Sequence, residues 1–259
     1  MPTLSDNINS NSKAQPKAVA LFVSDVHLSD ALPLTTATFL HFLSTQAIQA
    51  ERLYLLGDLF EYWAGDDDSD APYNQDIITA LRAVSDAGVA LYWMAGNRDF
   101  LVGESFAHQT SAQLLNDPHE LHLAGQHLLI SHGDALCTDD VSYMAFRAMV
   151  RNPAWQQQFL NKPLQERKAI ILGMRQASNS EQRNKSMAIM DVNQNAVAQL
   201  CEQYQGANLI HGHTHRTATH HETHGLRYVL PDWDCDHGTK ERGGYLRLEP
   251  SGKLQFIYL

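Results

Sequence analysis

Short apolar runs alternate with segments of helical periodicity along most of the chain. Residues 36–50 and 74–88 repeat their apolar side chains at helical spacing, and the second segment ends at Gly88, a residue typical of helix C-termini. The apolar runs around them are rich in Val, Leu and Tyr, which favours buried strands. The strands predicted in this way cover residues 18–24, 52–57, 89–96, 127–133, 207–213, 226–230 and 243–249. This alternation predicts an α/β fold built from stacked β-α units.

Two parts of the chain depart from this pattern. Residues 1–16 are polar and lack the apolar core of a signal peptide, so we expect a disordered tail before an ordered domain at 17–259. From about residue 137 to 190, at least three helical segments follow one another without a strand pattern. We therefore expect this stretch to form a helical insert within the α/β domain.

Composition narrows the class of protein. With 259 residues and 44% hydrophobic residues, the chain is long enough for one large globular domain. No apolar run approaches the roughly 18 residues of a membrane-spanning helix, and Cys137, Cys201 and Cys235 are odd in number and unlike a disulfide framework. These features predict a reducing, cytosolic setting, with a monomer as the working assumption. A net charge of −10 argues against general nucleic-acid binding, which needs a basic surface.

Side chains that can bind metal ions follow five of the predicted strands. They are Asp25 and His27 after the first, Asp58 after the second, Asn97 after the third, His132 after the fourth, and His213 and His215 after the fifth. Ligands bind beyond the carboxyl ends of the strands in open α/β sheets, so we expect these side chains to converge. One Gly-Asp or Gly-Asn pair after a strand is more often a turn, and a lone His-X-His also fits a surface cluster. Five occurrences in order favour one shared site.

The expected site offers oxygen and imidazole donors and no thiolate. This mixture suits Mn²⁺, Fe²⁺ or Zn²⁺ better than Mg²⁺. Seven donors exceed the needs of one four-coordinate ion. They fit two ions about 3.5–4 Å apart, bridged by a carboxylate and a water, which generate hydroxide and hold a phosphoryl group. The residues therefore predict a dinuclear site for phosphate-ester chemistry.

The order D-x-H, GD, GN, H and GHTH, from Asp25 to His215, resembles the calcineurin-like metallophosphoesterases. The resemblance implies an αββα sandwich, in which two facing sheets are flanked by helices, with a helical cap insert. It implies that one ion is held by Asp25, His27, Asp58 and His215, and the second by Asp58, Asn97, His132 and His213. His211 has no ligand role in that pattern, and we expect it to pack or to support the ligands.

The segment "GNRDFLVG" narrows the resemblance, because Arg98 stands where most of these phosphoesterases have His. Together with "LLGDLFEYWAGDD", "HGD" and "KSMAIMDVN", it resembles the UDP-2,3-diacylglucosamine diphosphatases of lipid A synthesis, which release UMP and an acylated sugar 1-phosphate. A guanidinium keeps its proton in proteins, so Arg98 can bind and neutralise charge but cannot act as a general acid. A phosphate leaving group is already a weak base and needs no such acid, which makes diphosphate cleavage a good fit.

The same resemblance implies roles for individual side chains. The catalytic residues it implies are Asp58, Asn97, Arg98 and His132. The substrate contacts it implies are Asn97, Arg98, Asp140, Ser178, Gln182, Lys185 and His213. The resemblance also implies two Mn²⁺ ions, a UDP-diacylglucosamine lipid as substrate, and a cytoplasmic protein bound peripherally to the inner membrane.

The predicted insert carries a charge opposite to that of the whole chain. Residues 147–185 contain eight basic and two acidic side chains, a formal charge of +6. One interpretation is a solvated helical face. The other is a basic, apolar lid that meets an anionic lipid surface and shelters acyl chains, with Trp155, Phe159 and Ile171 among its apolar side chains.

Three further segments have simple structural interpretations. We expect "DDDSD" (66–70) to be an exposed acidic loop and "HHETHG" (220–225) to be a hairpin between two strands. Pro231 stands where the resembled family has Gly, which changes the expected local turn. Two functions besides the lipid diphosphatase stay open: a soluble nucleotide or dinucleotide polyphosphate hydrolase, and a non-catalytic scaffold. The scaffold is disfavoured because it has no use for a complete set of ligands.

Overall fold

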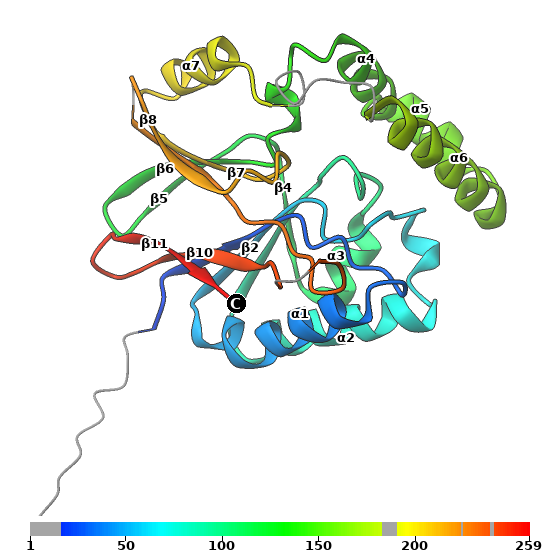
Figure 1. The fold of residues 1–259 in the computed structure, drawn as a ribbon. Coiled ribbons are helices and arrows are strands. Elements are labelled where there is room, and N and C mark those ends of the chain that lie inside the picture. The colour runs from blue at the N-terminus through cyan, green and yellow to red at the C-terminus, as the bar shows by residue number, and fades with distance from the viewer. Residues whose placement is uncertain (1–16, 183–190, 224, 239–240) are drawn as a thin grey trace, which may run out of the picture.

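Two β-sheets lie face to face and are flanked by helices (Figure 1). The computed structural model describes residues 17–182, 191–223, 225–238 and 241–259, with side chains described in 17–176 and in the later ranges. The predicted tail, residues 1–16, lies outside the described part. Six strands form one sheet and five the other, which confirms the αββα sandwich.

The six-stranded sheet contains the first three predicted strands. In the order β11-β10-β1-β2-β3-β4, strands β1 to β4 run parallel, β10 pairs antiparallel to β1, and β11 pairs antiparallel to β10. The strands are β1 (Ala20–Val23), β2 (Arg52–Leu56), β3 (Ala90–Met94), β4 (Gln113–Leu115), β10 (Gly244–Leu248) and β11 (Leu254–Tyr258). The outer face is covered by α1 (Pro33–Thr45), α2 (Pro72–Asp86) and α3 (Glu104–Thr110) (Figure 1). Gly88 follows the last turn of α2 at φ +88°, as its position in the sequence predicts.

The five-stranded sheet has the order β5-β6-β7-β9-β8 and is covered by α7 (Gln194–Gln203) (Figure 1). Its strands are β5 (His119–Leu123), β6 (Gln126–Ser131), β7 (Asn208–His211), β8 (Ala218–Glu222) and β9 (Gly225–Val229). Strands β8 and β9 pair antiparallel, which confirms the hairpin predicted at residues 220–225. Strands β6, β7 and β9 are parallel, so their carboxyl ends meet at one edge.

Successive side chains of a central strand point alternately to two parts of the core, one under the helices and one between the sheets. On β1, Leu21 and Val23 pack toward the helices, whereas Ala20 and Phe22 pack between the sheets. The rings of Phe22 and Tyr54 stack there with centroids 5.1 Å apart. Because both faces of the central strands are buried, their register is fixed, and a shift by one residue would exchange the two faces. This rigidity fixes where each strand ends, and hence where the loops that follow begin.

Three consecutive helices form a projecting cap at the position of the predicted insert. They are α4 (Val141–Val150), α5 (Pro153–Leu160) and α6 (Leu164–Gln182). The cap stands to one side of both sheets and reaches over their shared edge (Figure 1). Residues 183–190 of the predicted insert lie outside the described residues. None of the helices in the described ranges combines the length and the hydrophobicity needed to cross a bilayer.

The prediction of an exposed acidic loop at residues 66–70 is correct for Asp67 and Asp70, which are exposed, and wrong for Asp68, which is buried. The segment forms a 3₁₀ turn, η2 (Asp66–Asp68), and Asp68 is buried beside Lys168 of α6, with Nζ and Oδ1 2.6 Å apart. Asp66 accepts hydrogen bonds from the backbone N–H groups of Gly103 and Phe106 at the start of α3. These contacts hold α3 and the cap to the core, so Asp66 and Asp68 are turned inward while Asp67 and Asp70 face solvent.

Candidate metal centre

The carboxyl ends of the parallel strands bring the predicted ligands together. The ligand atoms of Asp25, His27 and His215 lie within 4.8 Å of one another, and those of Asp58, His132 and His213 form a second group of the same size. Asp25, Asp58 and His132 are buried. Thus the two groups that share an edge of the sandwich are the ones that the sequence pattern predicts, whereas their roles as metal ligands stay a prediction.

Asn97 lies beside the second group, and together they have the character of a cation site. His132 Nδ1 donates to the backbone carbonyl of Leu56 at 2.9 Å, so in the neutral ring Nε2 carries a lone pair. That Nε2 lies 2.9 Å from Asn97 Oδ1, which is also an acceptor. Two acceptors at this distance are stabilised by a cation between them, either a proton or a metal ion. Burial lowers the pKa of His132, but the carboxylates of Asp58, Asp25 and Asp134 raise it to about 9.

The first group also has donors directed at one another. His27 Nε2 lies 3.3 Å from His215 Nε2, and His215 Nε2 lies 3.4 Å from Asp25 Oδ1. Burial raises the pKa of Asp25, but the nearby His215, His132 and His27 lower it by more. The net pKa lies below its usual value, so the carboxylate is charged at neutral pH. A buried carboxylate with two imidazole nitrogens fits a divalent ion such as Mn²⁺, Fe²⁺ or Zn²⁺. The residues present therefore fit a pair of ions.

The backbone of the ligand loops is strained in a consistent way. Asp25, His27, Asp58, His213 and His215 all have left-handed conformations, with φ between 53° and 68°. Each costs about 1–3 kcal/mol for a residue other than glycine and persists only where surrounding contacts fix it. The loops supply such contacts, because the N–H groups of Asp25 and His27 donate to the carbonyls of Gly57 and Asp58 at 3.1 and 3.0 Å. Strain of this kind is concentrated at functional sites.

Asp99 connects two of the ligand loops, although the sequence pattern did not single it out. Its fully buried carboxylate accepts four backbone N–H bonds, from Asp58, Leu59, Phe60 and Gly96, at 2.8–3.3 Å. Burial and the charge of Asp58 raise the pKa of Asp99 to about 6. The sequence feature that could have pointed to Asp99 is its position in "GNRD", two residues after the candidate ligand Asn97. A Cβ on Gly96 would lie 2.1 Å from Asp58 Oδ1, so only glycine permits this approach.

Two more carboxylates contact the outer nitrogens of the imidazoles. Glu61 Oε2 lies 2.9 Å from His27 Nδ1, and Asp232 Oδ2 lies 3.5 Å from His215 Nδ1. A carboxylate at this position sets the tautomer and orientation of a metal-binding histidine. Asp232 follows Pro231, and the next residue, Trp233, donates its backbone N–H to Asp25 O at 3.0 Å. The turn at Pro231 therefore still returns the chain to the site.

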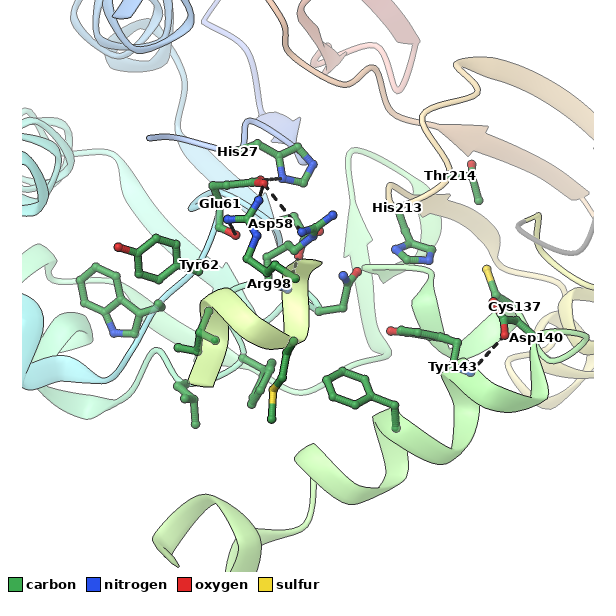
Figure 2. Close-up of a pocket in the computed structure, with 18 of the residues that line it drawn as sticks. His27, Asp58, Glu61, Tyr62, Arg98, Cys137, Asp140, Tyr143, His213 and Thr214 are labelled. Carbon is green, nitrogen blue, oxygen red and sulfur yellow. Dashed lines mark hydrogen bonds and ion pairs between the residues drawn. The ribbon is translucent and has the colours of Figure 1, made fainter. Parts of the chain in front are cut away.

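A cavity of about 670 Å³ opens beside the two groups (Figure 2). One end is lined by His27, Asp58, Asn97 and Arg98, while the cap contributes Trp155, Phe159, Ile171 and Met174 to the other. The Trp155 and Phe159 rings stack with centroids 4.9 Å apart. Volumes of 300–1,000 Å³ or so are typical of ligand sites. The cavity is polar at the end near the sheets and apolar under the cap.

The predicted substrate contacts fall into two sets. Asn97, Arg98, Asp140 and His213 line the cavity, and Asp140 also caps α4 by accepting from the backbone N–H of Tyr143 at 3.1 Å. Ser178 and Gln182 lie on α6, but their side chains are outside the described part, as is the whole of Lys185. Their contacts with substrate therefore stay predictions.

His211 has the packing role that was expected. It is fully buried, and Nδ1 donates to the carbonyl of Gly212 at 2.9 Å while Nε2 lies 3.3 Å from Arg227 Nη1. Burial lowers the pKa of His211 to about 4, so the ring is neutral at pH 7. It lies outside both groups of candidate ligands in the described residues.

The basic side chains of the cap are mostly paired, which neither interpretation of the insert anticipated. Arg147 and Arg151 face the buried Asp134, with shortest distances of 2.9 and 3.8 Å. The other pairs in the described residues are Lys162–Glu166, Arg167–Asp67, Lys168–Asp68 and Arg175–Glu61. Most of these partners belong to the core, so the charge of the cap holds it to the acidic core. Within residues 141–176, the basic side chains therefore do not form a free basic surface.

Comparison with known proteins agrees with the motifs. The calcineurin-like phosphoesterase family model matches residues 19–217. Proteins named UDP-2,3-diacylglucosamine hydrolase are 46% identical over 237 residues in Aromatoleum aromaticum and 49% identical over 220 residues in Escherichia coli. These alignments cover 90% and 83% of this chain, and 94% and 91% of the relatives.

The similarity to solved structures is weaker than the similarity to these relatives. A dimetal phosphatase from Danio rerio is 10% identical and aligns over 90% of this chain and 93% of its own, with a TM-score of 0.47. The motif set and the family match together confirm the resemblance read from the sequence. The chain therefore belongs to the calcineurin-like phosphoesterase family.

Proposed function

We propose that this chain hydrolyses the diphosphate of UDP-2,3-diacylglucosamine to UMP and 2,3-diacylglucosamine 1-phosphate, a step of lipid A biosynthesis. The observation that carries the proposal is the cavity, whose polar end adjoins the candidate ligands and whose other end is lined by apolar side chains of the cap. A nucleotide-linked lipid presents both a diphosphate and acyl chains. The names of the relatives in A. aromaticum and E. coli describe the same kind of substrate.

The proposed metal site uses seven side chains. One ion would be held by Asp25, His27, Asp58 and His215, and the other by Asp58, Asn97, His132 and His213. When bound, two such ions supply a water of lowered pKa and neutralise phosphoryl charge. We favour Mn²⁺, because the site combines imidazole with carboxylate and amide oxygens. Asp58 is the shared ligand, and its Oδ1 already accepts the backbone N–H of Arg98 at 2.8 Å.

Arg98 is proposed to bind the diphosphate without transferring a proton. Its guanidinium lines the cavity beside His27 and Asp58. Because it keeps its proton, it can neutralise the departing phosphate but cannot protonate it. Arg175 of the cap lines the same cavity and adds a second cation. Two guanidinium groups beside one phosphate-binding end fit a substrate with two linked phosphates better than one with a single ester.

The cap is proposed to act as a lid over the lipid part of the substrate. Trp155, Phe159 and Ile171 provide an apolar wall, while Asp140, Ser178, Gln182 and Lys185 are proposed to contact polar groups of the substrate. A soluble nucleotide would leave this wall without a partner, which disfavours the nucleotide polyphosphate hydrolase. Removing apolar area from water contributes about 25 cal/mol per Å², so acyl chains can supply much of the binding free energy.

We propose that the protein works as a monomer on the cytoplasmic face of the inner membrane, bound peripherally. The substrate has acyl chains, and the cap exposes Val141, Leu160 and Leu172. Exposed apolar side chains on helices favour contact with the membrane interface. Since the described basic side chains of the cap are paired, apolar contact is expected to matter more than charge.

Turnover of UDP-2,3-diacylglucosamine against a panel of soluble diphosphates, with Mn²⁺ added, tests the proposal. We expect the lipid substrate to be cleaved with a kcat/KM at least about a hundredfold above that of UDP-glucose or a dinucleotide polyphosphate, since the apolar wall contributes only to the lipid. Equal values for the lipid and the soluble diphosphates would contradict it and favour a general nucleotide hydrolase.

A further inference from the structure

Glu61 lies where the two central ligand loops run side by side. Leu28 donates its backbone N–H to Leu59 O at 2.7 Å, and Glu61 donates its own to Leu28 O at 3.0 Å. These bonds continue the parallel pairing of β1 and β2 beyond the sheet. Glu61 is thereby placed beside His27 by the backbone, three residues after Asp58.

The Glu61 carboxylate contacts three groups from three parts of the chain (Figure 2). Oε2 lies 2.9 Å from His27 Nδ1, and Oε1 lies 3.7 Å from Arg98 Nη1. Oε1 also forms an ion pair with Arg175 of α6, which donates a second bond to the backbone carbonyl of Glu61 at 3.3 Å. The side chain is only 21% exposed. One carboxylate thus faces a candidate metal ligand, the phosphate-binding end and the cap.

We propose that Glu61 is a positioning residue that couples the docking of the cap to the orientation of His27. The inference rests on the proposed metal site and names the residue that links this site to the proposed lid. Neither Glu61 nor Arg175 belongs to the motif-derived set of ligands and substrate contacts.

Toward the metal site, Glu61 acts through His27. The 2.9 Å between His27 Nδ1 and Glu61 Oε2 is an electrostatic contact without hydrogen-bond geometry. The carboxylate favours a proton on Nδ1, which leaves the lone pair on Nε2, and that atom faces His215 Nε2 at 3.3 Å. Loss of a partner of this kind typically weakens metal binding about 10–100-fold. Toward the cap, the negative charge lies between two guanidinium groups that would otherwise repel each other. Without that charge, Arg98 and Arg175 separate and α6 loses a contact with the core.

The two roles can be separated by two substitutions at one position. Glu61→Ala removes both the acceptor and the charge. Glu61→Gln keeps a partly negative amide oxygen beside His27 Nδ1 but carries no charge for the two guanidinium groups. Asp70→Asn is a matched control, because it removes one negative charge from an exposed residue nearby in the same loop. Circular dichroism and thermal melting check that each variant is folded.

Mn²⁺ binding without substrate, followed by electron paramagnetic resonance in a titration, measures the first role. We expect Glu61→Ala to weaken one of the two equivalents about 10–100-fold. We expect Glu61→Gln to stay within about threefold of the unsubstituted protein, since an oxygen remains beside His27 Nδ1. Asp70→Asn should bind as the unsubstituted protein does. Retention of both equivalents by Glu61→Ala at the control affinity would overturn the role toward His27.

Amide hydrogen exchange of residues 164–176 measures the second role. We expect faster exchange of α6 in both Glu61 variants and in Arg175→Ala, with no further increase when Glu61→Gln and Arg175→Ala are combined, because one ion pair is lost in all cases. Unchanged exchange in Glu61→Ala would overturn the coupling to the cap. If the unsubstituted protein bound fewer than two Mn²⁺, the proposed metal site would fail and the His27 role with it, while the exchange of α6 would still decide the second role.

Discussion

The metal centre and the cap are built in contrasting ways. Around the candidate metal centre the backbone fixes the side chains, through left-handed conformations at five of the seven candidate ligands and hydrogen bonds such as the four that Asp99 accepts. The cap is held by charged side chains at the ends of long, flexible stems, including Arg167, Lys168 and Arg175. A site fixed by backbone has one geometry, whereas a cap held by side-chain pairs can shift, and the proposed link between the two regions is the single side chain of Glu61.

This difference assigns chemistry and selectivity to different regions. Metal ions and a phosphoryl group need donors within a few tenths of an ångström of their places, which buried loops after rigid strands provide. Acyl chains need apolar area more than exact placement, which a helical wall provides. We therefore expect substitutions at the metal centre to affect every substrate and substitutions in the cavity wall of the cap to affect lipid substrates alone.

The largest expected effect is that of Asp58→Ala. This carboxylate is the proposed shared ligand, so its loss should lower turnover of both the lipid substrate and bis(p-nitrophenyl) phosphate by more than about a hundredfold. Steady-state kinetics on both substrates measures it, with circular dichroism as a check on folding. The exposed Asp70→Ala serves as control and should keep full activity. A variant that retained a tenth of its activity on either substrate would show that Asp58 is not shared.

A smaller effect is expected at Arg167, which joins the cap to the core. Its guanidinium is buried, pairs with Asp67 and donates to the backbone carbonyl of Ala64. Arg167→Ala should lower the free energy of unfolding by about 2 kcal/mol, since a buried hydrogen-bonded charge and its packing are lost. Urea denaturation measures the change.

Lys162→Ala is the matched control for Arg167→Ala. Lys162 also pairs within the cap, with Glu166, but both side chains are more than 40% exposed. Surface pairs of this kind contribute about 0.5 kcal/mol or less. Equal destabilisation by the two substitutions would contradict the view that the buried guanidinium of Arg167 docks the cap. Arg167→Ala should also leave hydrolysis of the small ester unchanged, because no ligand loop contains it.

The same contrast explains which parts of the fold could be predicted from the sequence. The central strands and the ligand loops were predictable, because continuous apolar runs mark buried parallel strands and polar donors follow them. Strands β4 and β5 and helices α3 and α7 were not predicted. They lie at sheet edges or on the surface, where short length or mixed polarity weakens the periodic signal.

The partners of individual charges could not be predicted. Asp66 and Asp68 lie within a run typical of a solvated loop, yet one caps α3 and the other pairs with Lys168, 100 residues further on. Likewise Glu61 follows the GD motif without any local sign of its contacts. Such pairings depend on how distant elements dock, and no spacing along the chain encodes them. The positive charge of the cap was visible in the sequence, but its neutralisation by the core was not.

The smallest expected effect tests the apolar wall of the cap. Ile171 lines the cavity, so Ile171→Ala should raise the KM for the lipid substrate about fivefold, which corresponds to about 1 kcal/mol of lost apolar contact. Its kcat and the hydrolysis of bis(p-nitrophenyl) phosphate should not change, because the ligand loops keep their places. Kinetics in mixed micelles of fixed lipid fraction measures both quantities.

Leu172→Ala distinguishes the wall of the cavity from the outer surface of the cap. Leu172 is the next residue on the same helix, is 59% exposed and does not line the cavity. If the wall binds acyl chains, Ile171→Ala raises the KM and Leu172→Ala does not. A rise for Leu172→Ala alone would mean that the cap contributes by docking on the lipid surface. A loss on the small ester in Ile171→Ala would show that the cap supports the metal centre, and the division between the two regions would no longer hold.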